Sequence, residues 1–369
     1  MKVIHILHEL KFSGAEIMYV DAASLFQAKG CELSVIATAE NIGEYAPYFE
    51  NAGYNLFNKP YPKLKNYLKR IVYYYHFVQF LKSENYDIVH IHASVTMWGM
   101  ALCAWIAGKR SVYTFHNVFP THFYSYFYHC LLRWSAKNIF NCNFQTISDS
   151  VYEHELKLYH NDTTKIYNWY GSNRFYPAKA GEKYAVREEL SIPQDALVLI
   201  SVGGCSPVKR HSEIIKALPL INEKHPNCIY LHLGKGESEC SEINLATELN
   251  VSSQIRFYEN QSDVRKFLIA ADIYMMPSRF EGIPITTIEA MGCLIPTILY
   301  NVPGLCDFNK NGENSILIPE DYKFLAEKAI YLHANPDVAL QMAMRAKEFV
   351  DFNFNIIKNT PLIFNLYAK

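Results

Sequence analysis

The stretch from Ala271 to Tyr300 constrains the fold of this chain more than any other. Ala271–Met276 is apolar and short enough to be a buried strand. After a polar loop, Pro284 suits the first position of a helix, and Gly292 suits the end of one. Ile295–Tyr300 has the composition of a further strand. The sequence here therefore predicts a strand, a loop, a short helix and a second strand.

The first half of the chain repeats this alternation of strands and helices. Five strands are expected there, at Val3–Leu7, Leu33–Thr38, Ile88–His92, Ser111–Phe115 and Asn143–Ile147. Repeated strand–helix alternation predicts a parallel sheet that is covered on both faces. Ligands of such sheets bind at the carboxyl ends of the strands, where Gly14, His92, His116 and Asn117 are expected to lie.

Length and composition indicate a chain that can fold without disulfide bonds or structural metal ions. With 369 residues, of which 50% are hydrophobic, the chain can form two domains with cores of their own. Nine cysteines without a Cys-x-x-Cys pair argue against both a disulfide framework and a zinc site, and a reducing cytosol is the simplest setting. No apolar run reaches the ~20 residues that a membrane span needs, and the apolar start at residues 3–7 is too brief for a signal peptide.

Positive charge is concentrated in one part of the chain. Residues 51–148 contain ten Lys and Arg but only two acids, Glu84 and Asp87, which gives a net charge of +8 there and −9 in the remainder. An uneven charge of this size predicts an anionic partner for the first half. No nucleic-acid-binding motif is present, so nucleic acid is not the expected partner.

Aromatic residues accompany these basic ones. Residues 61–81 are expected to form a basic, aromatic helix, and a second aromatic group follows: Phe119, Phe123, Tyr124, Tyr126, Phe127, Tyr128 and Trp134. Aromatic, Lys and Arg side chains with almost no acids are typical of a surface that docks on an anionic membrane. Alternatively, the aromatics belong to the core and the lysines form a solvated face.

Two carboxylates flank a predicted anion site around Gly282. The amides of Gly282 and Ile283 are expected at the positive end of a helix, which suits phosphate. Glu289 shares a helix face with apolar residues and needs hydrogen-bond donors, which ribose hydroxyls would supply. Glu281 could hold a second hydroxyl-rich group. The pattern predicts a nucleotide-sugar pocket, unless Glu281 only caps the helix and Glu289 pairs with a lysine.

A second phosphate-binding loop is predicted between a buried strand, Leu197–Val202, and the helix that follows it. Gly203 and Gly204 let backbone amides approach a diphosphate, and Lys209 would neutralise its charge. The order of these residues differs from a P-loop, and the third glycine of a dinucleotide-binding fingerprint is missing. The alternative is an ordinary strand–helix loop.

The Pro-Ser, Phe-Glu-Gly, Pro, Glu-Ala-Met and Gly-Cys elements between Pro277 and Cys293 resemble the retaining GT-B glycosyltransferases of family 4. Lys209 stands at the lysine of that family's Gly-Arg-x-x-x-x-Lys-Gly loop, with Gly204 in place of the arginine, for which Arg210 could compensate. The resemblance implies an α/β fold of two Rossmann-like domains facing across a cleft. It places the N-terminal acceptor-binding domain at 1–172, the C-terminal nucleotide-sugar domain at 173–349, and a helix returning to the first domain at 350–369.

The resemblance also assigns roles to individual residues. Glu281, His116 and Lys209 are the expected catalytic residues, and His92 and Asn117 are candidates on the acceptor side. Donor-binding residues, by the same resemblance and the loop arguments, are Gly14, Gly203, Gly204, Lys209, Arg210, Asn260, Gly282, Ile283, Pro284 and Glu289. The family's mechanism needs neither a metal nor another cofactor, so no metal ligands are expected.

The implied activity is transfer of a hexosyl or N-acetylhexosaminyl unit, with retention, from a nucleotide sugar, with a UDP-sugar favoured. The acceptor would be a hydroxyl of a saccharide, linked to a lipid diphosphate, in the assembly of a bacterial capsule, exopolysaccharide or O-antigen. The protein would be cytoplasmic and bound peripherally to the inner face of the cell membrane. The alternatives are another GT-B enzyme, such as a nucleotide-sugar epimerase, or a sugar-binding protein without catalytic activity.

Overall fold

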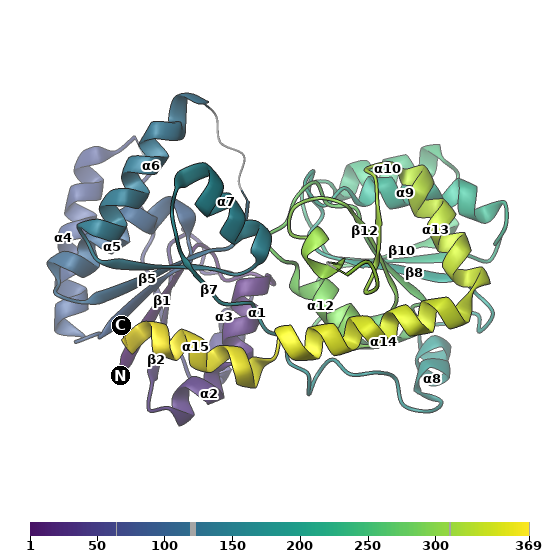
Figure 1. The fold of residues 1–369 in the computed structure, drawn as a ribbon, viewed down its shortest axis with the longest axis horizontal. Helices are drawn as coiled ribbons and strands as arrows, with labels where there is room; N and C mark the ends of the chain where they lie inside the picture. Colours follow the sequence, from purple (N-terminus) through teal and green to yellow (C-terminus); the bar gives the residue numbers. More distant parts are fainter. Residues whose placement is uncertain (64, 119–122, 310, 369) are drawn as a thin grey trace. The chain divides into compact units, whose positions relative to one another are not determined.

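The structure is a computed structural model that describes residues 1–63, 65–118, 123–309 and 311–368. The chain divides into two compact units: Met1–Trp169 with Ile356–Lys369, and Tyr170–Asn355. The sequence placed these divisions at 172/173 and 349/350, so the observed ones lie three residues earlier and six residues later. Each unit is built on one parallel sheet with helices between its strands (Figure 1).

The first unit contains a seven-stranded sheet with the order β3-β2-β1-β4-β5-β6-β7, and every neighbouring pair is parallel. Its strands are β1 (Lys2–Leu7), β2 (Glu32–Ala37), β3 (Asn55–Asn58), β4 (Ile88–Ile91), β5 (Arg110–Phe115), β6 (Cys142–Thr146) and β7 (Thr164–Lys165). β1 lies beside β4 because the chain reverses its direction of growth across the sheet after β3. His5 of β1 is thereby paired in register with His90 of β4.

The helices of this unit connect the strands in the way that the alternation predicts. They are α1 (Gly14–Asp21), α2 (Ala23–Ala28), α3 (Ala46–Asn51), α4 (Tyr67–Ser83), η1 (Ser94–Thr96), α5 (Met97–Ile106), α6 (Phe123–Asn138), α7 (Asp149–Tyr159) and the C-terminal α15 (Ile356–Ala368). The last helix belongs to the first unit, as expected, and the Tyr367 hydroxyl lies 2.6 Å from Nδ1 of His90.

The second unit contains a six-stranded parallel sheet with the order β10-β9-β8-β11-β12-β13. Its strands are β8 (Val198–Val202), β9 (Ile229–Leu233), β10 (Ile255–Tyr258), β11 (Ile273–Met276), β12 (Thr297–Tyr300) and β13 (Ile316–Ile318). Its helices are α8 (Glu182–Glu189), α9 (His211–Asn222), α10 (Glu239–Glu248), η2 (Ser252–Gln254), α11 (Val264–Ala270), α12 (Ile285–Gly292), η3 (Cys306–Asn309), α13 (Tyr322–Ala334) and α14 (Pro336–Asn353). The strand order changes direction between β8 and β11, which is where such sheets bind ligands.

Two helices differ in detail from what their sequences predict. Residues from about Glu16 to Lys29 have the sequence of a single helix, but the structure divides this segment at Ala22, which ends α1 and precedes α2. α12 does end at Gly292, but this glycine is required by packing, because a Cβ there would lie 2.5 Å from Cε2 of Tyr170. The left-handed residue after this helix is Leu294, with φ 66°.

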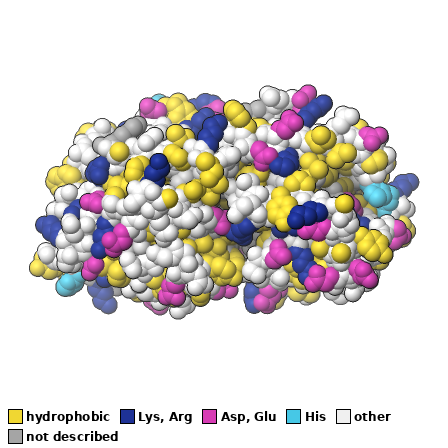
Figure 2. Space-filling model, turned by 90° about the horizontal axis from the view of Figure 1, so that it is seen from below, with side chains coloured by type: hydrophobic (Ala, Val, Ile, Leu, Met, Phe, Trp, Pro, Cys, Tyr) yellow, Lys and Arg dark blue, Asp and Glu magenta, His cyan; other side chains and the backbone are white. Residues whose placement is uncertain are grey.

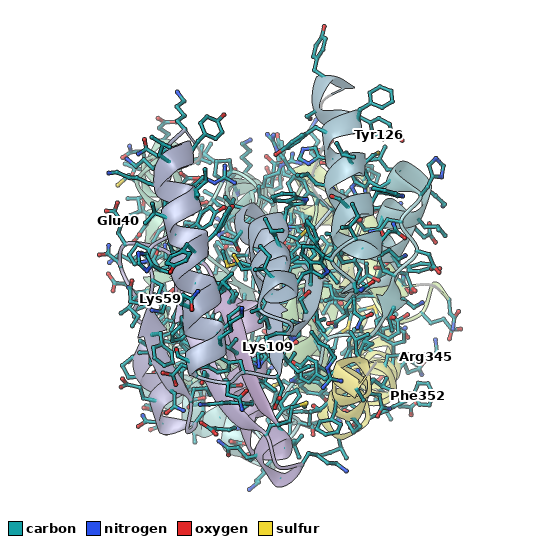
Figure 3. All side chains as sticks on the ribbon, turned by 90° about the vertical axis from the view of Figure 1, so that its left-hand side faces the viewer. Glu40, Lys59, Lys109, Tyr126, Arg345 and Phe352 are labelled. Carbon is teal, nitrogen blue, oxygen red and sulfur yellow. The ribbon has the colours of Figure 1, made fainter. Side chains whose placement is uncertain are left out.

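Many of the predicted surface aromatics are indeed exposed on the first unit. α5 packs against both α4 and α6, and Figure 3 looks onto these three helices. Their exposed large apolar side chains are Tyr67, Leu68, Ile71, Val72 and Tyr75 on α4, Trp105 and Ile106 on α5, and Tyr124, Phe127, Tyr128, Leu131 and Trp134 on α6. Phe119 and the side chain of Phe123 lie outside the described residues. Within the described part of the chain, no helix combines the length and apolarity needed to cross a bilayer.

Candidate functional site: the strand ends of the two units

The loop after β8 approaches the loop after β9 backbone to backbone. Gly234 has φ +132°, and a Cβ there would lie 2.1 Å from the carbonyl oxygen of Gly203. A Cβ on Gly236 would lie 2.2 Å from the carbonyl oxygen of Cys205. Only glycine fits at these two positions, since side chains would push the loops apart. The glycines therefore hold the predicted diphosphate loop, residues 203–210, against its neighbour.

Lys209 and Glu281, which the sequence placed on two separate loops, are in contact. The Lys209 ammonium lies 2.8 Å from Oε1 of Glu281, and both side chains are largely buried. The Arg279 amide donates to the Val208 carbonyl at 2.9 Å, which ties the loop after β11 to the loop after β8. The structure thus brings a cation and a carboxylate together at the carboxyl end of adjacent strands, the position that the sequence predicted for a ligand.

The amino end of α12 is anchored beside the same strand ends. Thr286, in its first turn, donates to the carbonyl of Val202, the last residue of β8, at 3.1 Å. The Glu281 amide donates to the Pro303 carbonyl at 3.0 Å. A Cβ at Gly304, which has φ +80°, would lie 2.3 Å from the Glu281 carbonyl oxygen. These contacts fix the residues at the positive end of the helix dipole next to the diphosphate loop.

The remaining donor-side candidates have different surroundings. Gly282, Ile283 and Pro284 are buried in front of α12, and Glu289 is buried within it. Pro284 precedes the helix by one residue, so it does not occupy the expected first position. Asn260 is exposed in the loop after β10.

Arg210, the suggested substitute for the missing family arginine, is engaged elsewhere. Nη1 lies 2.6 Å from Glu320, Nη2 lies 3.7 Å from Glu213, and the guanidinium stacks 5.4 Å from the ring centre of Tyr300. In this conformation two carboxylates already neutralise it. Lys209 is therefore the cation that this loop directs toward Glu281, and Gly204 contributes backbone alone.

In the first unit, three histidines from adjacent strands form a chain of hydrogen bonds. Nδ1 of His5 lies 3.1 Å from Nε2 of His92, and Nδ1 of His92 lies 2.9 Å from Nε2 of His116. Burial lowers the pKa of His5 to about 3 and that of His116 to about 4, and it lowers the pKa of His92 well below its ordinary value. All three imidazoles are therefore neutral at pH 7.

The direction of this chain follows from its buried end. Nε2 of His5 has no hydrogen-bond partner among the described residues. An unpartnered buried N–H costs more than an unpartnered lone pair, so the His5 proton belongs on Nδ1 and is donated to His92. His92 then donates from Nδ1 to His116, which keeps its own proton on Nδ1. His116, at the carboxyl end of β5, is thereby prepared as a neutral donor.

The other predicted residues of the first unit lie near these strand ends. Gly14 is the first residue of α1, and the Ser13 hydroxyl before it bonds to the Glu16 carboxyl. Burial raises the pKa of Glu16 to about 7. Asn117 follows His116, and its side-chain oxygen accepts a hydrogen bond from the Val118 amide at 2.8 Å. His90 is fully buried between Tyr367 and Thr114.

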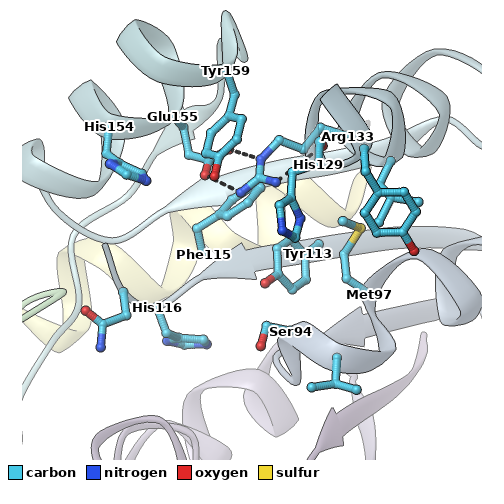
Figure 4. Close-up of a pocket in the computed structure, with 14 residues that line it drawn as sticks. Ser94, Met97, Tyr113, Phe115, His116, His129, Arg133, His154, Glu155 and Tyr159 are labelled. Atoms are coloured by element: carbon cyan, nitrogen blue, oxygen red, sulfur yellow. Dashed lines mark hydrogen bonds and ion pairs between the residues drawn. The ribbon is translucent and has the colours of Figure 1, made fainter. Parts of the chain in front are cut away.

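A pocket of about 360 Å³ opens beside His116 (Figure 4). It is lined by Ser94, Val95, Met97, Tyr113, Phe115, His116, Asn117, Tyr128, His129, Leu132, Arg133, His154, Glu155 and Tyr159. The Arg133 guanidinium is held by both oxygens of Glu155, at 2.7 and 2.8 Å, and lies 3.6 Å from the ring centre of Tyr159. Burial lowers the pKa of His129 and His154. The lining is aromatic and its charges are paired, a composition that fits a neutral, hydroxyl-rich ligand.

Sequence reasoning missed this pocket and the role of His5. The pocket needs α6 and α7 to converge on the end of β5, which no local pattern reports. From the sequence, His5 can be identified only as a residue of a strand. Its contact with His92 depends on the pairing of β1 with β4.

The chain has two units, each built on a parallel sheet. At the strand ends of one unit lie a glycine-lined loop, a largely buried Lys–Glu pair and the amino end of a helix. Together these features define a GT-B glycosyltransferase. The family description "Glycosyltransferase Family 4" matches residues 12–170, and "Glycosyl transferases group 1" matches residues 182–349. The chain belongs to this glycosyltransferase family, which confirms the resemblance seen in its sequence.

Individual proteins support the same assignment. The chain is 24% identical over 282 residues to N-acetyl-alpha-D-glucosaminyl L-malate synthase of Bacillus anthracis, covering 72% of this chain and 70% of that protein. It is 26% identical over 305 residues to the UDP-Gal:alpha-D-GlcNAc-diphosphoundecaprenol alpha-1,3-galactosyltransferase of Escherichia coli, covering 78% and 76%. The crystal structure of Anabaena Alr3699/HepE in complex with UDP and glucose superposes with a TM-score of 0.85, at 19% identity, over the full length of both chains.

Proposed function

We propose that this protein is a retaining glycosyltransferase that moves a hexosyl or N-acetylhexosaminyl unit from a UDP-sugar to a hydroxyl of a lipid-diphosphate-linked saccharide. The contact between Lys209 and Glu281 carries the proposal. A buried cation at a glycine-lined loop, beside the amino end of a helix, is suited to a diphosphate. The relatives named above include one whose name specifies UDP-Gal and a diphosphoundecaprenol acceptor.

On the donor side, the diphosphate would replace Glu281 as the partner of Lys209. The ammonium would stabilise the charge that builds on the leaving diphosphate, together with the amides before α12. Glu281 would then be released to accept hydrogen bonds from sugar hydroxyls, and Glu289 would hold the ribose. The bond between the anomeric carbon and the diphosphate oxygen breaks, the acceptor oxygen bonds to the same face of that carbon, and its proton passes to the departing diphosphate.

On the side of the first unit, the Nδ1–H of His116 would donate to a hydroxyl of the transferred sugar. A neutral donor is suited to this task because it adds no charge that would compete with Lys209 for the diphosphate. The pocket beside His116 would receive a sugar ring of the acceptor, since aromatic faces and neutral imidazoles match the apolar and hydroxyl faces of a saccharide. No step of this reaction draws on a metal or another cofactor.

The exposed aromatic face of α4, α5 and α6 would hold the protein against an anionic membrane, on the cytoplasmic side. The exposed Lys69 lies on α4 between the exposed Leu68 and Ile71, so apolar insertion and attraction to anionic lipid would act together. In contrast, the face of the molecule in Figure 2 mixes basic and acidic side chains. Sedimentation with vesicles should show binding that increases with the fraction of anionic lipid, and equal binding to neutral vesicles would contradict this part of the proposal.

Two alternatives make different predictions. A nucleotide-sugar epimerase would consume the UDP-sugar without any acceptor, and a sugar-binding protein would bind it without turnover. The main test is therefore release of UDP from a panel of UDP-sugars, with and without a polyprenyl-diphosphate saccharide, in excess chelator. The proposal requires acceptor-dependent release of UDP and an α-linked product from an α-linked donor. Release that does not depend on an acceptor, or none with any donor, would contradict it.

A further inference from the structure

Beneath the diphosphate loop, four potential metal ligands converge from four different elements. They are Cys205 in the loop, His211 at the start of α9, His232 in β9 and Glu242 in α10. One ligand atom from each lies within 4.8 Å of all the others, and all four residues are at most 2% exposed. None of them has a place in the proposed transfer reaction.

The hydrogen bonding of this cluster is incomplete without a further ligand. Both ring nitrogens of His211 are buried and have no partner among the described residues. A histidine with neither nitrogen satisfied is unfavourable in a protein core, because one of the two nitrogens always carries a proton. A bound ion would satisfy one nitrogen of His211, and a neighbouring water could serve the other.

The distances within the cluster lie a few tenths of an ångström on either side of those of tetrahedral coordination. Nε2 of His232 lies 3.8 Å from Sγ of Cys205 and 3.0 Å from one carboxylate oxygen of Glu242. The other carboxylate oxygen of Glu242 lies 4.0 Å from Nδ1 of His211. Ligands at ordinary zinc bond lengths, in a tetrahedron, are separated by about 3.3–3.6 Å. Small side-chain movements would therefore suffice to coordinate one ion.

We propose that Cys205, His211, His232 and Glu242 form a structural zinc site. The charges support a divalent ion, because a thiolate and a carboxylate with two neutral imidazoles balance it to zero in a buried position. A thiolate ligand favours zinc over magnesium or calcium. On binding, the Cys205 thiol loses its proton to solvent and its sulfur bonds to the ion. With four protein ligands the site has no open position for catalysis.

A second buried histidine cluster, in the first unit, differs from this one in its hydrogen bonding and charge. His5, His90 and His92 also bring three nitrogens together, but their partners include Tyr367 and Thr114, and only Nε2 of His5 is unpartnered among the described residues. That cluster has no anionic ligand, so a divalent ion would remain uncompensated in the core. It is complete without an ion.

The site would attach the diphosphate loop to the body of the second unit. Cys205 lies one residue after Gly204, whereas His232 and Glu242 belong to β9 and α10. The ion would therefore fix the loop that carries Lys209 without contacting the substrate. The cysteine spacing argued against a zinc site because the four ligands are spread over 38 residues without a compact motif.

The test uses the full chain, purified without a metal-affinity step, and measures its metal content by mass spectrometry. About one zinc per chain is expected. X-ray absorption at the zinc edge should report one sulfur and three nitrogen or oxygen ligands, and it needs no variant. A chain that holds no zinc after equilibration with it, or a spectrum without sulfur, would overturn the proposal.

Variants locate the ion. In the cobalt-loaded protein, thiolate-to-cobalt absorption should appear in the wild type, disappear in Cys205→Ser and persist in Cys228→Ser, which changes an equally buried cysteine outside the cluster. His211→Ala should lower the affinity for zinc more than about tenfold, since even changes behind the ligands have effects of that size. Retention of the absorption in Cys205→Ser would place the ion elsewhere. None of these measurements depends on glycosyl transfer.

Discussion

The strand ends of the two units differ in how they handle charge. In the second unit, the residues that the sequence singled out form a buried ion pair, Lys209 with Glu281, next to the amino end of α12. In the first unit, the predicted His92 and His116 join His5 in a chain of neutral imidazoles that ends at His116. A charged end suits the diphosphate of a nucleotide sugar, whereas a neutral end suits hydroxyl groups. The division of labour in the proposed reaction is thus visible in the chemistry of each unit separately.

Removing the Lys209 cation should have the largest effect on activity. Lys209→Ala is expected to lower kcat/KM about a thousandfold, because it removes charge stabilisation of the leaving diphosphate. UDP should also bind more weakly in calorimetry. The control is Lys266→Ala, which breaks an ion pair of 2.6 Å with Glu189; neither of these two residues is a predicted site residue. Unchanged UDP affinity in Lys209→Ala would show that the diphosphate binds elsewhere.

The backbone contact between Gly234 and Gly203 supports the loop that carries Lys209. Gly234→Ala should destabilise the protein by about 3 kcal/mol, since its Cβ would meet the Gly203 carbonyl at 2.1 Å and its φ of +132° is strained for alanine. Gly181 also has positive φ, at +76°, but no atom lies within 4 Å of its Cβ position. Gly181→Ala should cost about 1 kcal/mol through strain alone. Equal losses in urea unfolding, followed by circular dichroism, would contradict the packing argument.

Residues that act within one loop or between adjacent strands could be read from the sequence, and those that act across the fold could not. The Lys209 and Glu281 loops follow strands with clear apolar patterns, so their meeting at one sheet edge followed from the parallel sheet. The engagement of Arg210 depends on Glu320, which lies 110 residues further along the chain. The need for glycine at position 292 depends on Tyr170. Neither Glu320 nor Tyr170 can be identified as a contact from the residues that surround Arg210 or Gly292 in the sequence.

A substitution at the neutral strand ends of the first unit should lower the rate of turnover and leave nucleotide binding unchanged. His116→Ala is expected to lower kcat about a hundredfold, the usual contribution of a positioned hydrogen-bonding group in a transition state. The affinity for UDP should stay as in the wild type, because UDP lacks the sugar. His333→Ala, at an exposed histidine of α13, serves as the control. Loss of UDP affinity in His116→Ala would mean that the two ends do not divide the substrate as proposed.

The smallest expected effect is a dependence of the first unit's stability on pH. His5, His90, His92 and His116 have a folded-state pKa below that of the unfolded chain, so the unfolded state binds more protons as the pH falls below about 6.5. Stability should therefore decrease on acidification. Glu16 opposes this, because its raised pKa of about 7 lets the folded state take up a proton in the same range.

The net loss between pH 7 and pH 6 should be on the order of 2 kcal/mol, with these four histidines acting against one carboxyl. The lowered pKa of His129 and His154 adds to the loss in the same direction. All four tryptophans, Trp98, Trp105, Trp134 and Trp169, belong to the first unit, so tryptophan fluorescence in urea reports on that unit alone. The variant Glu16→Gln removes the opposing group and should steepen the loss. A stability that rises on acidification would show that the imidazole chain accepts protons in the folded protein, and His116 could then no longer be the neutral donor.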